Sequence, residues 1–171
     1  FCLGTCTGLA VPVAQKFGAK SYSEMRKFVM NAAYLAIFLA MIMTIVTCAL
    51  CGSILTWMKT PDQFYQGAYD YLFVIFLGIP FTFLYNVVAG IIRSLGDSKT
   101  PFYFLVLSAV MNIFLDMLFI IVFKLGTAGA GWATILSQAI SGVLCFRYMK
   151  KKYDILKTNH QERRLNMHYI K

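Results

Sequence analysis

The chain of 171 residues is 59% hydrophobic and only 13% charged, and its formal net charge is +9. A typical soluble domain is roughly 45–50% apolar and about 25% charged, so this composition excludes an ordinary soluble protein and indicates an integral membrane protein. The basic residues gather in particular connections instead of spreading over one face, which argues against nucleic acid as a partner.

Uncharged stretches predict the helices in chain order, because roughly 20 apolar residues at about 1.5 Å per residue cross a bilayer core. The first apolar segment, 1–17, is short for a crossing and opens in mid-segment, so we interpret the sequence as a fragment that begins in a helix. Four complete spans are predicted at about 28–52, 69–92, 102–123 and 128–148. The expected fold is an all-α integral membrane protein, an antiparallel bundle of transmembrane helices within the lipid bilayer.

The five cysteines all lie in apolar segments, and an odd number scattered among helices does not indicate a disulfide framework. Cys48 and Cys51 form a CxxC pair, for which a redox role is the alternative. Helix-embedded cysteine usually behaves as a small hydrophobe, and we prefer that interpretation.

Basic residues alternate between successive connections, which predicts the orientation in the membrane. One set comprises Lys16, Lys20, Arg26, Lys27, Arg93, Lys99, Arg147, Lys150, Lys151 and Lys152, and the intervening loops hold Lys59 and Lys124. The positive-inside rule places the first set in the cytoplasm, so we expect a multi-pass protein of the cell membrane with a basic cytoplasmic tail. We interpret residues 150–171 as a cytoplasmic linker, with an RNA-binding arm as the alternative.

Sparse polar residues recur at helical spacing within the predicted spans, which places them on one face of each helix. The three sets are Thr82 and Asn86, flanked by Gly78 and Gly90; Ser108, Asn112 and Asp116; and Thr134, Ser137, Gln138 and Ser141. Pro80 is expected to kink the span 69–92 near mid-depth. Close helix packing is the preferred interpretation of Gly78 and Gly90.

Asp116 is the only charged residue between Lys99 and Lys124, within "MNIFLDMLFII". Carboxylates inside the membrane are costly and mark ion or proton pathways. Counted from the predicted helix ends, Asp116 lies about 10 Å and Thr134 about 9 Å below the outer boundary, so the two side chains share a level. Carboxylate, amide and hydroxyl oxygens suit Na⁺ by analogy with other hard cations, whereas a proton needs only the carboxylate.

The run "RSLGDSKTPFYFLVLSAVMNIFLDMLFIIVFKLGTAGAGWATILSQAISGVL" resembles the end of the fourth helix through the sixth helix of a MATE (multidrug and toxic compound extrusion) transporter. "GLAVPVAQKFGAK" is similar to the end of that family's second helix, and "YLFVIFLGIPFTFLYNVVAGIIRSLGD" to its fourth. The elements "LGDSKTP" and "NIFLD" are specific in combination. The resemblance covers about residues 4–149 in order, spacing and topology.

The resemblance implies that residues 1–149 are part of an N-terminal six-helix lobe, from late helix two to helix six, and that 150–171 lead toward a second lobe. Such transporters export cationic or amphipathic drug-like compounds against an inward Na⁺ or H⁺ gradient, without another cofactor. By the resemblance, Asn112, Asp116 and Thr134 match the residues of the family's cation site. That site also uses an acidic residue of a first helix, which this sequence lacks. Candidates for lining the lumen are Thr82, Asn86, Ser108, Ser137 and Gln138. The expected partners are therefore the bilayer, drug-like substrates, the first helix and the C-terminal lobe.

Two other functions remain open from the sequence. A lipid-linked oligosaccharide flippase of the same superfamily should have more Arg and Lys in its lumen. A scaffold subunit of a membrane complex should tolerate neutralisation of Asp116. An enzyme is not expected, because both histidines, His160 and His168, lie in the hydrophilic tail and no nucleophile and base occur at a recognisable spacing.

The loop charges generate a topology prediction. Cysteines introduced at Gln66 and Thr127 should react with an impermeant thiol reagent added outside intact cells, whereas cysteines at Ser21 and Ser98 should be protected. Permeabilised cells, in which all four positions should react, provide the control. Labelling with the reverse pattern would overturn the orientation.

Overall fold

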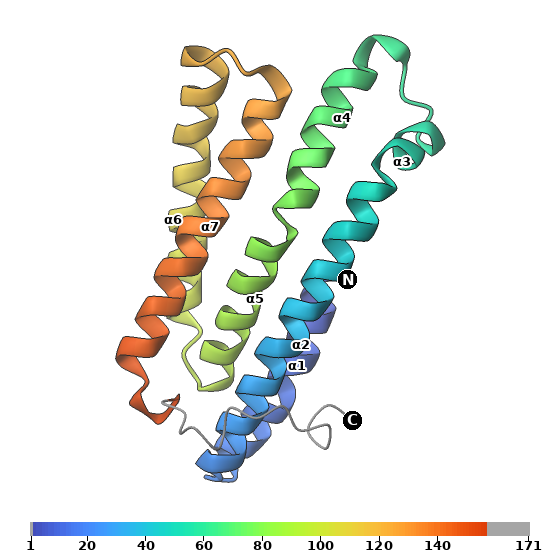
Figure 1. Cartoon of the computed structure of the whole chain (residues 1–171). Helices are drawn as coiled ribbons and strands as arrows, with labels where there is room; N and C mark the ends of the chain where they lie inside the picture. The colour runs from blue at the N-terminus through green and yellow to red at the C-terminus, as the bar shows by residue number, and fades with distance from the viewer. Residues whose placement is uncertain (1, 157–171) are drawn as a thin grey trace.

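The computed structural model describes residues 2–156, which form an elongated bundle of helices without strands in that range (Figure 1). The longer helices are α1 (Cys2–Gly18), α2 (Tyr22–Ala49), α4 (Asp62–Leu77), α5 (Ile79–Ser94), α6 (Lys99–Met117) and α7 (Gly126–Lys152). Shorter elements are α3 (Cys51–Trp57), the π-helical turn η1 (Leu118–Val122) and the 3₁₀ turn η2 (Asp154–Leu156). Most of the expected linker, 157–171, lies outside the described residues.

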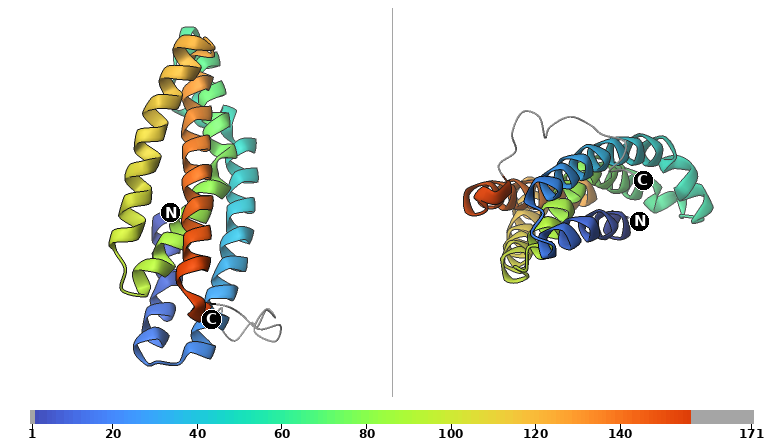
Figure 2. Two further views of the ribbon diagram at one scale, coloured as in Figure 1. Left: turned by 90° about the vertical axis from the view of Figure 1, so that its left-hand side faces the viewer. Right: turned by 90° about the horizontal axis from the view of Figure 1, so that it is seen from below.

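The two ends of the bundle differ in charge. One end gathers the α1–α2 turn, the α5–α6 connection and the residues after α7, and we call it the basic end (Figure 1). The opposite end carries the α3–α4 and η1–α7 connections. Consecutive long segments run in opposite directions, as Figure 2 shows from two further sides, so the antiparallel order expected from the short connections is present.

Several helices differ from the bounds predicted from apolar stretches. The helix predicted at 28–52 begins at Tyr22 and ends at Ala49. Leu50 interrupts the helix there, and α3 begins at the next residue. The span predicted at 69–92 begins seven residues earlier, at Asp62, and is divided into α4 and α5. Polar residues extend the helix ends because the backbone hydrogen bonds of a helix do not require apolar side chains.

Apolar side chains cover the outside of the bundle as well as its core. On α6, Ile113, Phe114 and Met117 are 60%, 68% and 55% exposed. Three helical segments, Tyr22–Ala49, Lys99–Val122 and Gly126–Lys152, are long and apolar enough to cross a membrane, and the pair α4 and α5 is a fourth if it is one bent span. Water would oppose such an exposed surface whereas lipid solvates it, so the predicted all-α membrane bundle is confirmed.

Helices α4 and α5 meet at a bend of 42° around Gly78. Pro80 is near the start of α5, where its missing N–H removes the hydrogen bond that would continue the helix. Gly78 lies directly against α7, and a Cβ at this position would be 2.6 Å from Cγ1 of Ile135. The bend and the absent side chain together let this span approach α7 closely.

Helix α7 packs against α4, α5 and α6 through small side chains. Buried residues recur every four positions along it: Gly129, Ala133, Ser137, Ser141, Cys145 and Met149. Ser141 also donates to the carbonyl of Phe104 on α6 at 2.6 Å, and Tyr85 on α5 donates to the carbonyl of Pro101 at 2.8 Å. In lipid, where helices gain little from hydrophobic association, close packing and such interhelical bonds hold the bundle together.

The contact at Gly78 generates a stability prediction. Gly78→Ala should destabilise the protein by about 1–3 kcal/mol, the usual cost of an overpacked core, because the new methyl group collides with Ile135. Thermal unfolding of the purified protein in detergent measures the change. The matched control is Gly142→Ala on α7, whose Cβ would meet nothing closer than 3.6 Å. Equal stability of the two variants would show that the helices can separate at Gly78 without cost.

Candidate functional site

The hairpin of α6 and α7 brings together two of the three predicted cation-site residues. Asn112 on α6 donates from Nδ2 to Oγ1 of Thr134 on α7 at 3.3 Å. Thr134 in turn donates to the carbonyl of Ala130, one turn earlier in its own helix, at 2.9 Å. The carbonyl oxygen of the Asn112 amide and a remaining lone pair of the Thr134 hydroxyl can therefore accept further bonds.

Asp116 lies one helical turn from Asn112, close to the end of α6. Its Oδ1 atom is buried and has no hydrogen-bond partner among the described residues. A buried, unsatisfied carboxylate oxygen is expensive, because it has lost water without gaining a donor or a cation. This atom is accordingly the part of the hairpin that most requires a proton, a cation or a donor from elsewhere.

The register of the hairpin differs from the depth count made from the sequence. That count placed Asp116 level with Thr134, but the structure places Asn112 against Thr134. Helix α7 begins at Gly126 and not at 128, so Thr134 lies further from the turn than predicted. The π-helical turn η1 also shortens the segment that follows α6, because a π-helical turn has more residues and less rise per residue than an α-helical turn.

The turn η1 begins two residues after Asp116. π-Helical segments are rare in proteins. Those that occur are often at functional sites, where they change the direction of neighbouring side chains. The hairpin thus combines an irregular helix with an unsatisfied carboxylate oxygen. The oxygen atoms that it offers are the carboxylate of Asp116, the amide of Asn112 and the hydroxyl of Thr134, which together suit a proton or a hard cation. No group of three His, Cys, Asp or Glu side chains that could hold a metal is found within residues 2–156.

The candidate lumen residues fall into two groups. Thr82 on α5 donates to Oε1 of Gln138 on α7, and Asn86 donates to the carbonyl of Thr82 at 2.7 Å. These three side chains are half-buried, with Thr82 and Gln138 joined across the α5–α7 contact, and Ser108 is half-buried on α6. Ser137 is different: it is only 1% exposed and donates to the carbonyl of Thr134 at 2.9 Å. In the described bundle it therefore packs between helices.

A shallow pocket of about 470 Å³ lies between α4 and α7 near the end opposite the basic end. Its lining is largely apolar and includes Phe64, Tyr71, Thr127 and Ala130. None of the predicted cation-site or lumen residues lines it. The polar positions of the hairpin and this surface hollow are therefore separate features.

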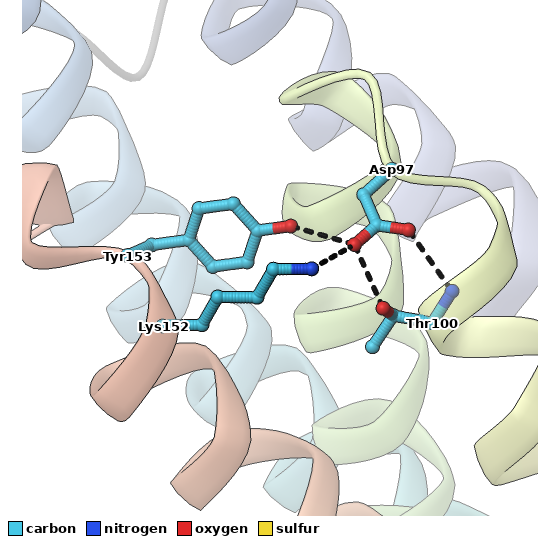
Figure 3. Close-up of polar contacts among 4 residues, drawn as sticks. All are labelled: Asp97, Thr100, Lys152 and Tyr153. Atoms are coloured by element: carbon cyan, nitrogen blue, oxygen red, sulfur yellow. Dashed lines mark hydrogen bonds and ion pairs between the residues drawn. The ribbon is translucent and has the colours of Figure 1, made fainter.

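The sequence interpretation missed a polar cluster at the basic end, centred on Asp97 (Figure 3). Oδ2 of Asp97 accepts bonds from the hydroxyl of Thr100 at 2.7 Å, Nζ of Lys152 at 2.9 Å and the hydroxyl of Tyr153 at 2.8 Å. Oδ1 accepts the backbone N–H of Thr100 at 3.0 Å. The available signal was the Asp-x-x-Thr spacing across the start of a helix, where an Asp side chain commonly accepts a backbone N–H of the first turn.

These contacts determine the charge of Asp97. The N–H of Thr100, followed by the Lys152 ammonium and the Thr100 hydroxyl, holds the pKa of the Asp97 carboxyl well below its usual range. The carboxylate is consequently ionised at physiological pH. Its partners come from the first turn of α6, from the last residue of α7 and from the residue after it.

Comparisons with known proteins agree with this architecture. The family model MatE matches residues 1–118. The chain is 30% identical over 168 residues to a probable multidrug resistance protein of Bacillus subtilis, YoeA, covering 96% of this chain and 36% of that protein. It is 44% identical over 98 residues to a second such protein of Bacillus subtilis, YpnP, covering 57% of this chain and 22% of that protein.

A solved structure shows the same fold. The outward-facing conformation of a multidrug resistance MATE family transporter of the MOP superfamily superimposes with a TM-score of 0.89 at 23% identity. The superposition covers 99% of this chain and 38% of that structure, so the chain spans little more than a third of the length of a solved transporter. The match of the MatE model to more than half of the residues, together with this helix arrangement, shows that the chain belongs to the MATE family of membrane transporters.

Proposed function

We propose that this chain supplies most of the N-terminal lobe of a cation-coupled multidrug efflux antiporter. MATE proteins are transporters and not enzymes, and relatives of this chain carry names of multidrug resistance proteins. In the proposal, residues 1–149 are the lobe, from late helix two to helix six, and 150–171 lead toward the second lobe. The exported compounds are amphipathic or cationic drug-like molecules, and the driving ion is Na⁺ or H⁺.

The buried Oδ1 atom of Asp116 is the observation that carries this proposal. No described donor reaches this buried oxygen, so it is available to take up a proton or to contribute to binding a cation. A group of this kind can change its occupancy when the site opens to one side of the membrane, which is what coupling to a gradient requires. Transporters place coupling sites at such helix interfaces.

The two coupling ions make different use of the site. Protonation of Asp116 would convert the unsatisfied oxygen into an O–H group that can donate, and it needs no other ligand. Sodium would need several oxygens, and the amide of Asn112 and the hydroxyl of Thr134, which bond to each other on the hairpin, are the candidates. Asn112, one helical turn before Asp116, is bonded to Thr134, so both neutral side chains belong to the hairpin that carries the carboxylate, and the proposal keeps both Na⁺ and H⁺ as the driving ion.

The bend at Gly78 has a role in the same proposal. Thr82 and Asn86 follow the bend by about one and two turns, and Thr82 bonds Gln138 across the α5–α7 contact. A bent span can change its angle at one point while its two halves stay helical. We place Pro80 at this point as the residue that maintains the bend, with the basic end in the cytoplasm and the protein in the cell membrane.

The proposal is tested by Asp116→Asn in the transporter that contains this chain. The substitution keeps the size and removes the charge, so expression should persist while gradient-driven efflux of a fluorescent cationic dye disappears. Efflux is measured in cells and in proteoliposomes with imposed Na⁺ or pH gradients. Asp62→Asn, at an exposed acidic position on α4, is the matched control and should transport normally.

Graded effects are expected at the neutral ligands. Thr134→Val and Asn112→Ala each remove one uncharged partner, worth about 1 kcal/mol, so the cation concentration needed for half-maximal efflux should rise several-fold. An Asp116→Asn transporter with the normal efflux rate and the normal dependence on Na⁺ and pH would show that the carboxylate is structural.

A further inference from the structure

The residues directly after α7 are attached to the basic end of the bundle from two sides. Tyr153 donates to Asp97, which lies in the α5–α6 connection (Figure 3). Arg26, in the first turns of α2, donates from Nη1 to the carbonyl of Ile155 at 3.4 Å. The segment Tyr153–Leu156 therefore contacts elements that are far away in the sequence.

Apolar packing supports the same attachment. Tyr153, Ile155 and Leu156 are partly buried and pack against the hydrophobic core formed by α1, α2, α5 and α7. The backbone of the segment is also bonded, because the N–H of Tyr153 reaches the carbonyl of Met149 and the N–H of Leu156 reaches that of Tyr153, both at 3.0 Å. The segment after α7 therefore stays packed against the helix bundle.

Asp97 is the most connected polar group of this attachment. Its side chain is 19% exposed and that of its partner Lys152 is 47% exposed, compared with 37% and 47% for the surface ion pair of Lys16 and Glu24, so the shielding is on the carboxylate side. Exposed pairs contribute little, whereas a shielded carboxylate with several charge-assisted or hydroxyl donors is held firmly. Gly96, with φ of +89°, makes the turn that precedes Asp97, a backbone conformation that other residues rarely adopt.

We propose that Asp97 is a positioning residue that keeps Tyr153–Leu156 fixed to the N-terminal lobe throughout the transport cycle. This inference rests on the proposed function, because it assumes that the chain continues from this segment into a second lobe. The lobe and the start of its connection then move as one body. Asp97 thereby determines the place and the direction in which the chain leaves the lobe.

Hydrogen exchange in the purified transporter tests the attachment. Asp97→Asn and the milder Tyr153→Phe should each accelerate exchange of the backbone amides of Tyr153–Leu156, by about tenfold for Asp97→Asn, because local opening becomes easier. Exchange in the α6–α7 hairpin should not change. Tyr103→Phe is the matched control, since the Tyr103 side chain is 68% exposed on α6. Unchanged exchange at Tyr153–Leu156 in both variants would overturn the proposal.

Cross-linking tests whether the attachment persists during transport. Cysteines at Ser98 and Lys151, both exposed and outside the cluster, are joined by a short flexible bismaleimide. Efflux should continue at the rate of the single-cysteine controls treated with the same reagent, because the two positions move together. Loss of efflux only in the cross-linked protein would show that the segment must separate from Asp97, and the proposal would be wrong.

The two proposals can fail independently. The exchange measurement does not require transport, so its outcome stands even if Asp116→Asn leaves efflux unchanged. Transport kinetics give a second distinction: Asp97→Asn should lower the maximal efflux rate without changing the cation concentration for half-maximal efflux, whereas changes at Asn112 or Thr134 should alter that concentration. An Asp97→Asn variant that shifts the cation dependence instead would contradict a positioning role.

Discussion

Close packing along α7 is the constraint on which the rest of the structure depends. Helices in lipid gain little from hydrophobic association, so they adhere only where their backbones approach closely and bond to one another. Small buried residues recur every four positions on α7, and at Gly131 a Cβ would be only 3.0 Å from Val74 of α4. The bend at Gly78 follows from the same requirement, since it brings the α4–α5 span against Ile135. Larger residues on α7 would separate it from its neighbours.

This packing also determines what happens to polar side chains inside the bundle. Where α7 lies close to another helix, polar groups find partners, as Thr82 does with Gln138 and Asn112 with Thr134. Asp116 lies just before α6 becomes a π-helical turn, and its Oδ1 atom has no partner among the described residues. This oxygen is therefore a local exception in the described bundle, which satisfies most of its buried polar groups. Exceptions of this kind are expected where function, and not stability, determines the residue.

The helices, their order and the family could be predicted from the sequence, because long apolar segments and antiparallel connections depend on local composition. The pairing of Asn112 with Thr134 could be predicted only to within one helical turn, since the count assumed regular α-helix up to Phe123 and a later start of α7. The π-helical turn has no clear signal in an apolar run such as "LFIIV". The cluster around Asp97 was missed for another reason. Lys152 was counted only as part of a basic tail, because its partner Asp97 is 55 positions away and no local pattern links the two residues.

The distance in sequence between Asp97 and Lys152 has a consequence for the assembly of the protein. During synthesis, Asp97 can bond Thr100 almost at once, but Lys152 and Tyr153 are made 55 and 56 residues later. The α6–α7 hairpin must be inserted first, and with both helices in the correct direction, before these groups meet on one side of the membrane. An inverted α7 would leave its lysines across the bilayer from Asp97, where no bond can form. The cluster is therefore a contact that only a chain with both helices in the described directions can complete.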